Sequence, residues 1–338
     1  MIPHNDIMEY LASQAPLFDR EIENVVPRNR EPFEVYGILW DFLDRGGKRF
    51  RPAMVKLSYE AVGGKPADEA ALIVPVGAAI EMFHNFTLIH DDIEDESEMR
   101  RGKPTLHRAY GTPLAINAGD GLFMMVWEAL LRSKLPPEKM FGVQRILSSA
   151  FRRVLEGQAI ELNWYREKRF DIDEELYFTM VGGKTGALIS ASCETGAFIG
   201  GSDAEQAAAL RNFGTAVGVA FQVQDDVLNL MGREDKYGKE IGGDMSEGKR
   251  SLITIHALAH APVKERKRLT EILTARTKDP AKVREAIEIC RKSGSIDYAA
   301  QAARQMVDDA KKGLMILPNN EASRRLLQLA DFFIHREM

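Results

Sequence analysis

Apolar residues recur along this chain at intervals of three and four positions, which is the spacing of one buried helical face. The clearest case starts at Asp68, a plausible N-cap. Its apolar face consists of Leu72, Ile73, Val76, Ala79, Ile80 and Phe83. The same spacing predicts long helices over 114–132, 138–162, 173–199 and 203–231, and several shorter ones in the last 80 residues.

Breaks between these segments coincide with glycine or proline pairs such as Gly63-Gly64. No segment alternates convincingly between apolar and polar residues, as a half-buried strand would. Several predicted helices are apolar on more than one side, which places them inside a bundle. No linker divides the chain, so we expect one all-α domain over 1–338. Within it, residues 232–251 alternate glycines with charges, and we expect a mobile loop there.

Composition narrows the class of protein. The 338 residues include 45 Lys and Arg against 50 Asp and Glu, a net charge of −5, which disfavours nucleic acid as a partner. The first residues show no export signal, and no apolar run reaches the roughly 18 residues of a membrane span. The best run, 70–80, ends at Glu81. We therefore expect no membrane span and a cytoplasmic location. Cys193 and Cys290 lack metal-ligand spacing and are expected in the core.

Three aspartates follow an apolar helix in the segment LIHDDIEDESEMRRGKPT, namely Asp91, Asp92 and Asp95. Residues four apart on a helix share a face and lie roughly 6 Å apart along its axis. The carboxylates of Asp91 and Asp95 would therefore repel each other unless a cation joins them, and Mg²⁺ prefers such oxygen ligands. Taken alone, the motif also fits a solvated acidic helix end.

A second acidic motif favours the metal interpretation. Asp225, Asp226 and Asn229 repeat the spacing at the end of another apolar helix. If the two helices face each other across a bundle, their carboxylates could hold one polyanion through several Mg²⁺ ions. Basic residues that suit phosphate oxygens accompany the motifs or lie in glycine-rich segments. They are Lys48, Arg49, Arg51, Arg100, Arg101, Lys184, Lys239 and Lys249.

Taken together, these segments resemble the trans-isoprenyl diphosphate synthases, or polyprenyl synthetases. The matching segments occur in the family's order: GGKRFRP, Glu81 with His84, the first aspartate motif with RRGKPT, Gly157-Gln158, GGKTG, FQVQDD and the closing LLQLADFFIHR. Each is weak alone, but the ordered set is specific. The resemblance implies a single-domain helical bundle around a central cavity, and a homodimer.

The resemblance also implies a reaction, in which magnesium assists ionisation of an allylic diphosphate that then condenses head-to-tail with isopentenyl diphosphate. By the same resemblance the magnesium ligands are Asp91, Asp95 and Asp225, with Asp92 and Asp226 in support. The allylic diphosphate would be bound by Arg100, Lys184, Lys239 and Lys249. Isopentenyl diphosphate would be bound by Lys48, Arg51, His84 and Arg101. Thr185 and Gln222 would lie beside the reacting carbons, where their dipoles stabilise an allylic cation.

Two positions depart from the family pattern. Asn229 replaces the third aspartate of the second motif, which weakens its grip on metal. Glu161 stands where an aspartate often follows the GQ pair. We expect activity to survive both changes.

Product length depends, by the same resemblance, on bulky residues upstream of the first motif that form the floor of a tunnel. Phe86 and Phe83 lie five and eight residues before Asp91 and share a helical face, whereas Thr87 is small. This pattern resembles geranylgeranyl diphosphate synthases. Farnesyl or longer products stay open, because both phenylalanines also fit an ordinary core.

Two other functions fit less well. A class I terpene cyclase shares the first motif and the all-α fold. It would, however, need Ser or Thr at 229 and Glu at 233, where this chain has Asn229 and Arg233. A non-catalytic synthase subunit should have lost acidic or basic residues that this chain keeps. The sequence therefore favours an active prenyltransferase.

Overall fold

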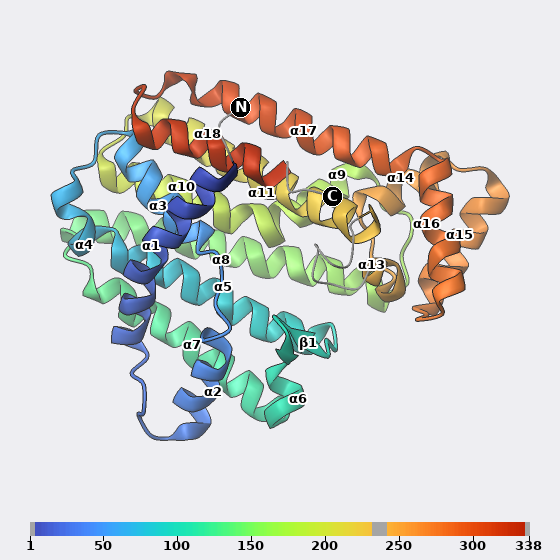
Figure 1. Cartoon of the computed structure of the whole chain (residues 1–338), viewed down its shortest axis with the longest axis horizontal. Helices are drawn as coiled ribbons and strands as arrows, with labels where there is room; N and C mark the ends of the chain where they lie inside the picture. Colours follow the sequence, from blue (N-terminus) through green and yellow to red (C-terminus); the bar gives the residue numbers. More distant parts are fainter. Residues whose placement is uncertain (1–3, 232–241, 335–338) are drawn as a thin grey trace. The chain divides into compact units, whose positions relative to one another are not determined.

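The computed structural model describes residues 4–231 and 242–334, and nearly all of this part is helical (Figure 1). Contacts divide the chain into two compact units. The boundary falls inside four continuous helices: α8 (Pro137–Arg166), α10 (Ala187–Gly200), α11 (Ala204–Met231) and α18 (Glu321–Ile334). The predicted all-α class is confirmed, whereas the single domain over 1–338 stays a prediction.

Unit 1 consists of Met1–Ile146, Ser192–Ala207 and Leu317–Leu326. Besides parts of the shared helices, it contains short strands β1 (Met99–Arg100) and β2 (Lys103–Pro104), which form an antiparallel hairpin. Its other elements are α1 (His4–Val25), α2 (Phe33–Leu43), α3 (Phe50–Ala61), η1 (Pro66–Asp68), α4 (Glu69–Leu72), α5 (Val74–Glu94), α6 (Leu106–Tyr110) and α7 (Thr112–Arg132).

Helix α5 forms the centre of unit 1 and packs along α7 (Figure 1). Its residues Val76, Ala79, Ile80 and Phe83 are fully buried, as the apolar spacing predicted. Gly119 of α7 makes room for the His90 ring of α5, since a Cβ there would lie 2.4 Å from His90 Nε2. The acidic end of α5 is thus held by a well-packed helix pair.

Unit 2 consists of Leu147–Ala191, Ala208–Ile316 and Leu327–Met338. Its buried centre includes the face of α11 that carries Phe213, Val217, Ala220 and Val223. Helices α14 (Leu252–His260) and α16 (Pro280–Lys292) both pack on α17 (Ser295–Gly313). The elements that lie wholly in this unit are α9 (Glu174–Val181), η2 (Gly182–Gly186), α13 (Gly243–Glu247), α14 (Leu252–His260), α15 (Val263–Ala275), α16 (Pro280–Lys292), α17 (Ser295–Gly313) and η3 (Leu314–Ile316).

Three of the predicted segments differ from the structure. The helix expected from Asp68 is interrupted, and the Asp68 side chain caps nothing; α5 begins at Val74, with Pro75 in its first turn, where a missing N–H costs no hydrogen bond. The helix expected over 173–199 contains a π-helical turn, η2, between α9 and α10. Part of the expected mobile loop is ordered as α13, while 232–241 lie outside the described residues.

Among the described residues, α7 is long and apolar enough to cross a membrane, and α5 passes the same test only together with the bent segment before it. Of the most apolar window of α7, 44% is buried in the fold, and core helices of soluble proteins meet this test as well.

Candidate active site

The first aspartate motif lies at the C-terminal end of α5. Asp92 is buried, whereas the side chain of Asp91 is 22% exposed. Asp95 follows the helix as its C-cap, and its backbone N–H donates to the Asp91 carbonyl at 2.9 Å. The structure therefore keeps Asp91 and Asp95 one helical turn apart, as the spacing predicted.

Arg100 is brought back to this helix end by the β1–β2 hairpin. The hairpin turns at Arg101 and Gly102, which both have positive φ angles of 52° and 77°. Arg100 Nε then donates to Asp92 Oδ1 at 2.8 Å, and Arg100 Nη2 lies 3.7 Å from Asp91 Oδ2. Burial raises the pKa of Asp92, and the Arg100 guanidinium opposes this shift. Asp92 therefore orients Arg100 beside Asp91.

A basic group in unit 1 surrounds His84 on α5. Burial lowers the pKa of His84 well below its usual value, and the nearby Arg51, Arg101, Arg100 and Arg49 lower it further. His84 is therefore a neutral imidazole. Burial also lowers the pKa of Arg51 to about 10, and its Nε has no hydrogen-bond partner in the described part of the chain. An unsatisfied buried N–H donor suits an anionic ligand.

Arg49 plays a structural part that the sequence did not reveal. It is buried at the start of α3 with a positive φ of 51°. Its Nε donates to Asp19 at 2.7 Å and its Nη1 donates to Glu81 at 3.0 Å. Glu81 and Arg49 thus fix the loop that carries Lys48, whose Nζ lies 5.7 Å from the Phe50 ring centroid.

An aromatic cluster lies on α5 upstream of the aspartates. The ring centroids of Phe83 and Phe86 are 5.4 Å apart, and Phe123 of α7 lies 5.9 Å from the first and 5.1 Å from the second. Trp127 extends the cluster along α7. Thr87 donates a hydrogen bond to the His84 carbonyl at 2.8 Å. The sequence identified the α5 residues and missed Phe123, which only the α5–α7 packing reveals.

The second aspartate motif, in unit 2, is built around the buried Asp226. Its Oδ1 accepts from Lys249 Nζ at 2.8 Å and from Gln222 Nε2 at 3.0 Å. Its Oδ2 lies 3.4 Å from the hydroxyl of Tyr177, which donates to it. Gln222 Oε1 in turn accepts from Thr185 Oγ1 at 3.3 Å. The structure thus connects predicted residues from α11, η2 and the segment before α14.

Lys249 stays charged in this environment. Burial alone would lower its pKa, but Asp226, Asp244 and Glu161 together raise the pKa of Lys249 well above its usual value. Asp244 Oδ2 lies 3.4 Å from Lys249 Nζ. Asp244 lies in the segment interpreted as a loop, so the sequence missed it.

Asn229 has a structural partner. It is buried, and its Oδ1 accepts the backbone N–H of Asp244 at 3.0 Å. The side chain at this position therefore anchors α13 to α11.

Asp225, one residue before Asp226, is partly exposed. Lys239 lies outside the described residues.

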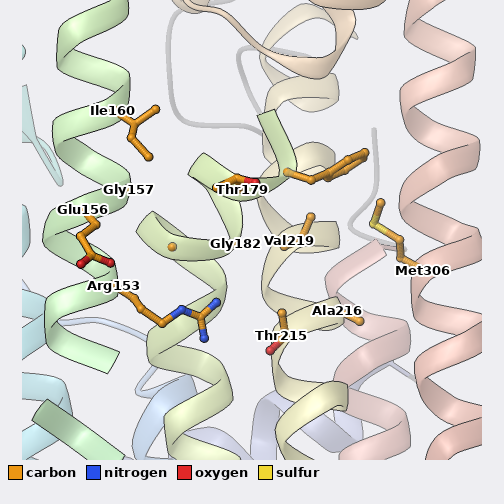
Figure 2. Close-up of a pocket in the computed structure, with 12 residues that line it drawn as sticks. Arg153, Glu156, Gly157, Ile160, Thr179, Gly182, Thr215, Ala216, Val219 and Met306 are labelled. Carbon is orange, nitrogen blue, oxygen red and sulfur yellow. The ribbon is translucent and has the colours of Figure 1, made fainter. Parts of the chain in front are cut away.

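Lys184 and Thr185 lie in the π-helical turn η2. Lys184 Nζ lies 2.6 Å from Glu161 Oε2 on α8. The turn packs closely against α8 at Gly157, where a Cβ would lie 2.3 Å from the backbone nitrogen of Lys184. Figure 2 shows Gly157 facing the turn at Gly182. A pocket of about 480 Å³ lies beside the turn and is lined by α8, α9, α11 and Met306.

No group of three or more His, Cys, Asp and Glu side chains that could hold a metal ion occurs within 4–231 and 242–334. A metal at either motif would therefore complete its coordination with oxygens from elsewhere, such as those of a substrate.

Comparisons with known proteins identify the family. A model described as polyprenyl synthetase matches residues 33–290. The chain belongs to this family. A short chain isoprenyl diphosphate synthase of Methanothermobacter thermautotrophicus is 38% identical over 332 residues, which cover 98% of this chain and 99% of the relative. A geranylfarnesyl diphosphate synthase of Natronomonas pharaonis is 33% identical over 339 residues, which cover 96% of each protein.

A solved structure agrees with this assignment. Geranylgeranyl pyrophosphate synthetase from Pyrococcus horikoshii is 40% identical in sequence and superimposes with a TM-score of 0.92. The match covers 98% of this chain and 99% of that one. Polyprenyl synthetases condense isopentenyl diphosphate with allylic diphosphates, so this chain is a trans-prenyltransferase. The predicted family, fold and enzyme class are confirmed. Relatives with different products show that membership alone leaves the product length open.

Proposed function

We propose that this polyprenyl synthetase makes geranylgeranyl diphosphate. The proposed product length is supported by the aromatic cluster of Phe83, Phe86 and Phe123. Phe86 precedes Asp91 by five residues, which is about 7.5 Å along the helix axis. Three rings in mutual contact resist displacement better than one, because each gains from its neighbours. They suit the floor of a short product tunnel. Farnesyl and longer products are the alternatives.

The basic residues divide into two proposed substrate sites. Arg100, Lys184 and Lys249 bind the allylic diphosphate, together with Lys239. Each of the three described residues is already held by a carboxylate, at Asp92, Glu161 and Asp226 respectively. Because these cations are already oriented, little free energy is lost to their reorientation when negative charge develops on the departing diphosphate. Lys48, Arg51, His84 and Arg101 bind isopentenyl diphosphate, which is supported by the unpartnered Arg51 Nε.

Magnesium is the proposed cofactor, and the residues fit it. Asp91, Asp95 and Asp225 are partly exposed carboxylates and would hold the metal. Asp92 and Asp226 are buried against Arg100 and Lys249, so their part is to support these cations. When bound, magnesium neutralises the negative charge of the diphosphate leaving group.

The reaction then follows from the proposed positions. The carbon–oxygen bond of the allylic diphosphate breaks, and Arg100, Lys184 and Lys249 hold the departing diphosphate. Thr185 and Gln222 turn their dipoles toward the allylic cation. The basic residues hold the diphosphate of isopentenyl diphosphate, so that its double bond attacks the allylic cation and forms the new carbon–carbon bond. The resulting tertiary cation loses a proton to the departing diphosphate, which forms the new double bond.

A product assay tests this proposal directly. The purified chain is incubated with magnesium, isopentenyl diphosphate and, in turn, dimethylallyl, geranyl and farnesyl diphosphate, and the products are separated by length. We expect accumulation at four isoprene units. Accumulation at three or five units would overturn the product length. Cyclic hydrocarbons or no product would contradict the condensation.

We expect Phe86→Ala to lengthen the product by one or more isoprene units, because it opens the cluster below Asp91. Phe123→Ala should lengthen it as well, since Phe123 contacts both α5 rings. Phe198→Ala, on α10 against Gly142, is the control for loss of a phenylalanine elsewhere in unit 1. An unchanged product in both cluster variants would place the floor elsewhere.

We also propose that the enzyme is a homodimer. Ile116, Met124 and Leu131 of α7 are exposed and lie within about 80° of one another around the helix. Phe141 at the start of α8 is exposed as well. A row of large apolar side chains on the surface of unit 1 is typical of a protein interface. The predicted cytoplasmic location stays a prediction.

A further inference from the structure

Asp226 uses both carboxylate oxygens on groups of the protein. Lys249 and Gln222 donate to Oδ1, and the Tyr177 hydroxyl donates to Oδ2. Asp226 is 2% exposed and Tyr177 is 1% exposed, so water does not take the place of these partners. Of these three partners, Tyr177 alone was not predicted as a site residue from the sequence.

The position of Tyr177 is fixed independently of the aspartate. It lies in α9, whose first turn is capped by Asp173 accepting from the Leu176 N–H at 2.8 Å. Its ring meets that of Phe178 edge-on, with centroids 5.4 Å apart. Tyr177 therefore offers Asp226 a hydroxyl from a neighbouring helix that does not depend on α11.

We infer that Tyr177 is a positioning residue for prenyl transfer, which acts through Asp226 to aim Lys249 and Gln222. This inference rests on the proposed roles of those two residues. A carboxylate can rotate about its Cβ–Cγ bond, and rotation would exchange the oxygen that Lys249 and Gln222 share. The hydroxyl on Oδ2 opposes that rotation and so keeps Oδ1 directed at both donors.

Without the hydroxyl, Oδ2 is buried and unsatisfied. We expect the carboxylate to turn so that its two oxygens divide between Lys249 and Gln222. Either side chain then shifts by a fraction of an ångström, which is enough to disturb an aligned reaction. Gln222 would also carry Thr185 with it, because the two are hydrogen-bonded.

The variant Tyr177→Phe tests the inference. Hydrogen bonds to charged groups are stronger than those between neutral groups, and a tenfold change in rate corresponds to about 1.4 kcal/mol. We expect kcat to fall about tenfold and the KM for the allylic diphosphate to rise. The KM for isopentenyl diphosphate should stay constant, because its proposed ligands are other residues. Tyr298→Phe is the matched control, since it removes a half-buried hydroxyl that likewise donates to a carboxylate, that of Glu174, at 2.7 Å.

A double-mutant cycle with Asp226→Asn separates positioning from a general structural effect. If Tyr177 acts through Asp226, Tyr177→Phe should add little to the loss already caused by Asp226→Asn. Losses that multiply, or a Tyr177→Phe enzyme with wild-type kcat and allylic KM, would overturn the inference. Full activity of Asp226→Asn and of Lys249→Ala would instead contradict the proposed function. Thermal unfolding of each variant identifies loss of folded protein.

Discussion

The two adjacent aspartates of each motif differ in exposure and in their partners. The first member, Asp91 or Asp225, is partly exposed, and the second, Asp92 or Asp226, is buried against a cation. Leaving a buried cation unpaired is costly, so the second aspartate is fixed by its partner. The first keeps oxygens accessible to a ligand. One DD dipeptide thus combines a candidate metal ligand with an orienting group.

Asp91→Ala should reduce kcat at least a hundredfold at saturating magnesium, since it removes a proposed ligand of the magnesium that neutralises the leaving diphosphate. Asp309→Ala is the control, because Asp309 is an exposed aspartate that pairs with Lys312. Steady-state turnover at several magnesium concentrations measures the effect. Wild-type rates for Asp91→Ala would remove it from the metal site.

Glu69 makes the stability of unit 1 depend on pH. Burial, together with a hydrogen bond to Glu60, raises the pKa of Glu69 to about 7, although Lys56 opposes the shift. The folded chain therefore binds this proton more tightly than the unfolded chain does. Stability is full below the ordinary carboxyl pKa and declines as pH rises through about 7.

We expect Glu69→Gln to remove about 1 kcal/mol of the difference in unfolding free energy between pH 5 and pH 8, allowing for solvent screening. Urea unfolding at both pH values measures it. Glu205→Gln, an exposed control, should leave the difference unchanged. If the unfolding free energy of Glu69→Gln depends on pH as that of the wild type does, Glu69 is not the group that causes the pH dependence.

Among the helices, the spacing of apolar residues predicted the bounds well where a helix runs without interruption. Helix α11 begins at Ala204 and ends at Met231, against a prediction of 203–231. Periodicity failed at η2, because the spacing of apolar residues does not show a local change in hydrogen-bond register from an α-helix to a π-helical turn. It also failed for Tyr177 and Phe123, since their importance depends on contacts between helices distant in sequence.

The π-helical turn depends on close packing against α8, and two glycines test this. Gly157→Ala places a Cβ against backbone of the turn, whereas Gly182→Ala places one in open space at an ordinary helical φ. We expect Gly157→Ala to cost about 1–3 kcal/mol of stability and to lower kcat about tenfold or more. Gly182→Ala should be neutral or stabilising by about 0.5–1 kcal/mol. Equal effects of the two substitutions on stability and kcat would show that the π-helical turn does not depend on its close approach to α8.

At the scale of the whole molecule, the two motifs belong to different units, α5 to the first and the C-terminal part of α11 to the second. The sequence predicted that the motifs meet around one cavity, and this stays a prediction. Within each unit, however, the structure supplies the orientation that sequence alone lacks: Arg100 beside Asp91 and Lys249 on Asp226.

The exposed row on α7 tests the proposed homodimer. We expect Met124→Glu combined with Leu131→Glu to yield a monomer, because two charges in an apolar interface lose hydration without gaining partners. The side chains are 62% and 75% exposed in the single chain, so the folded monomer should tolerate both changes. Sedimentation velocity at micromolar concentration measures the assembly state. Met315→Glu, at a residue 79% exposed in η3, is the matched control and should leave the dimer intact. A wild-type monomer, or a dimer that survives both α7 substitutions, would show that this face is not the interface.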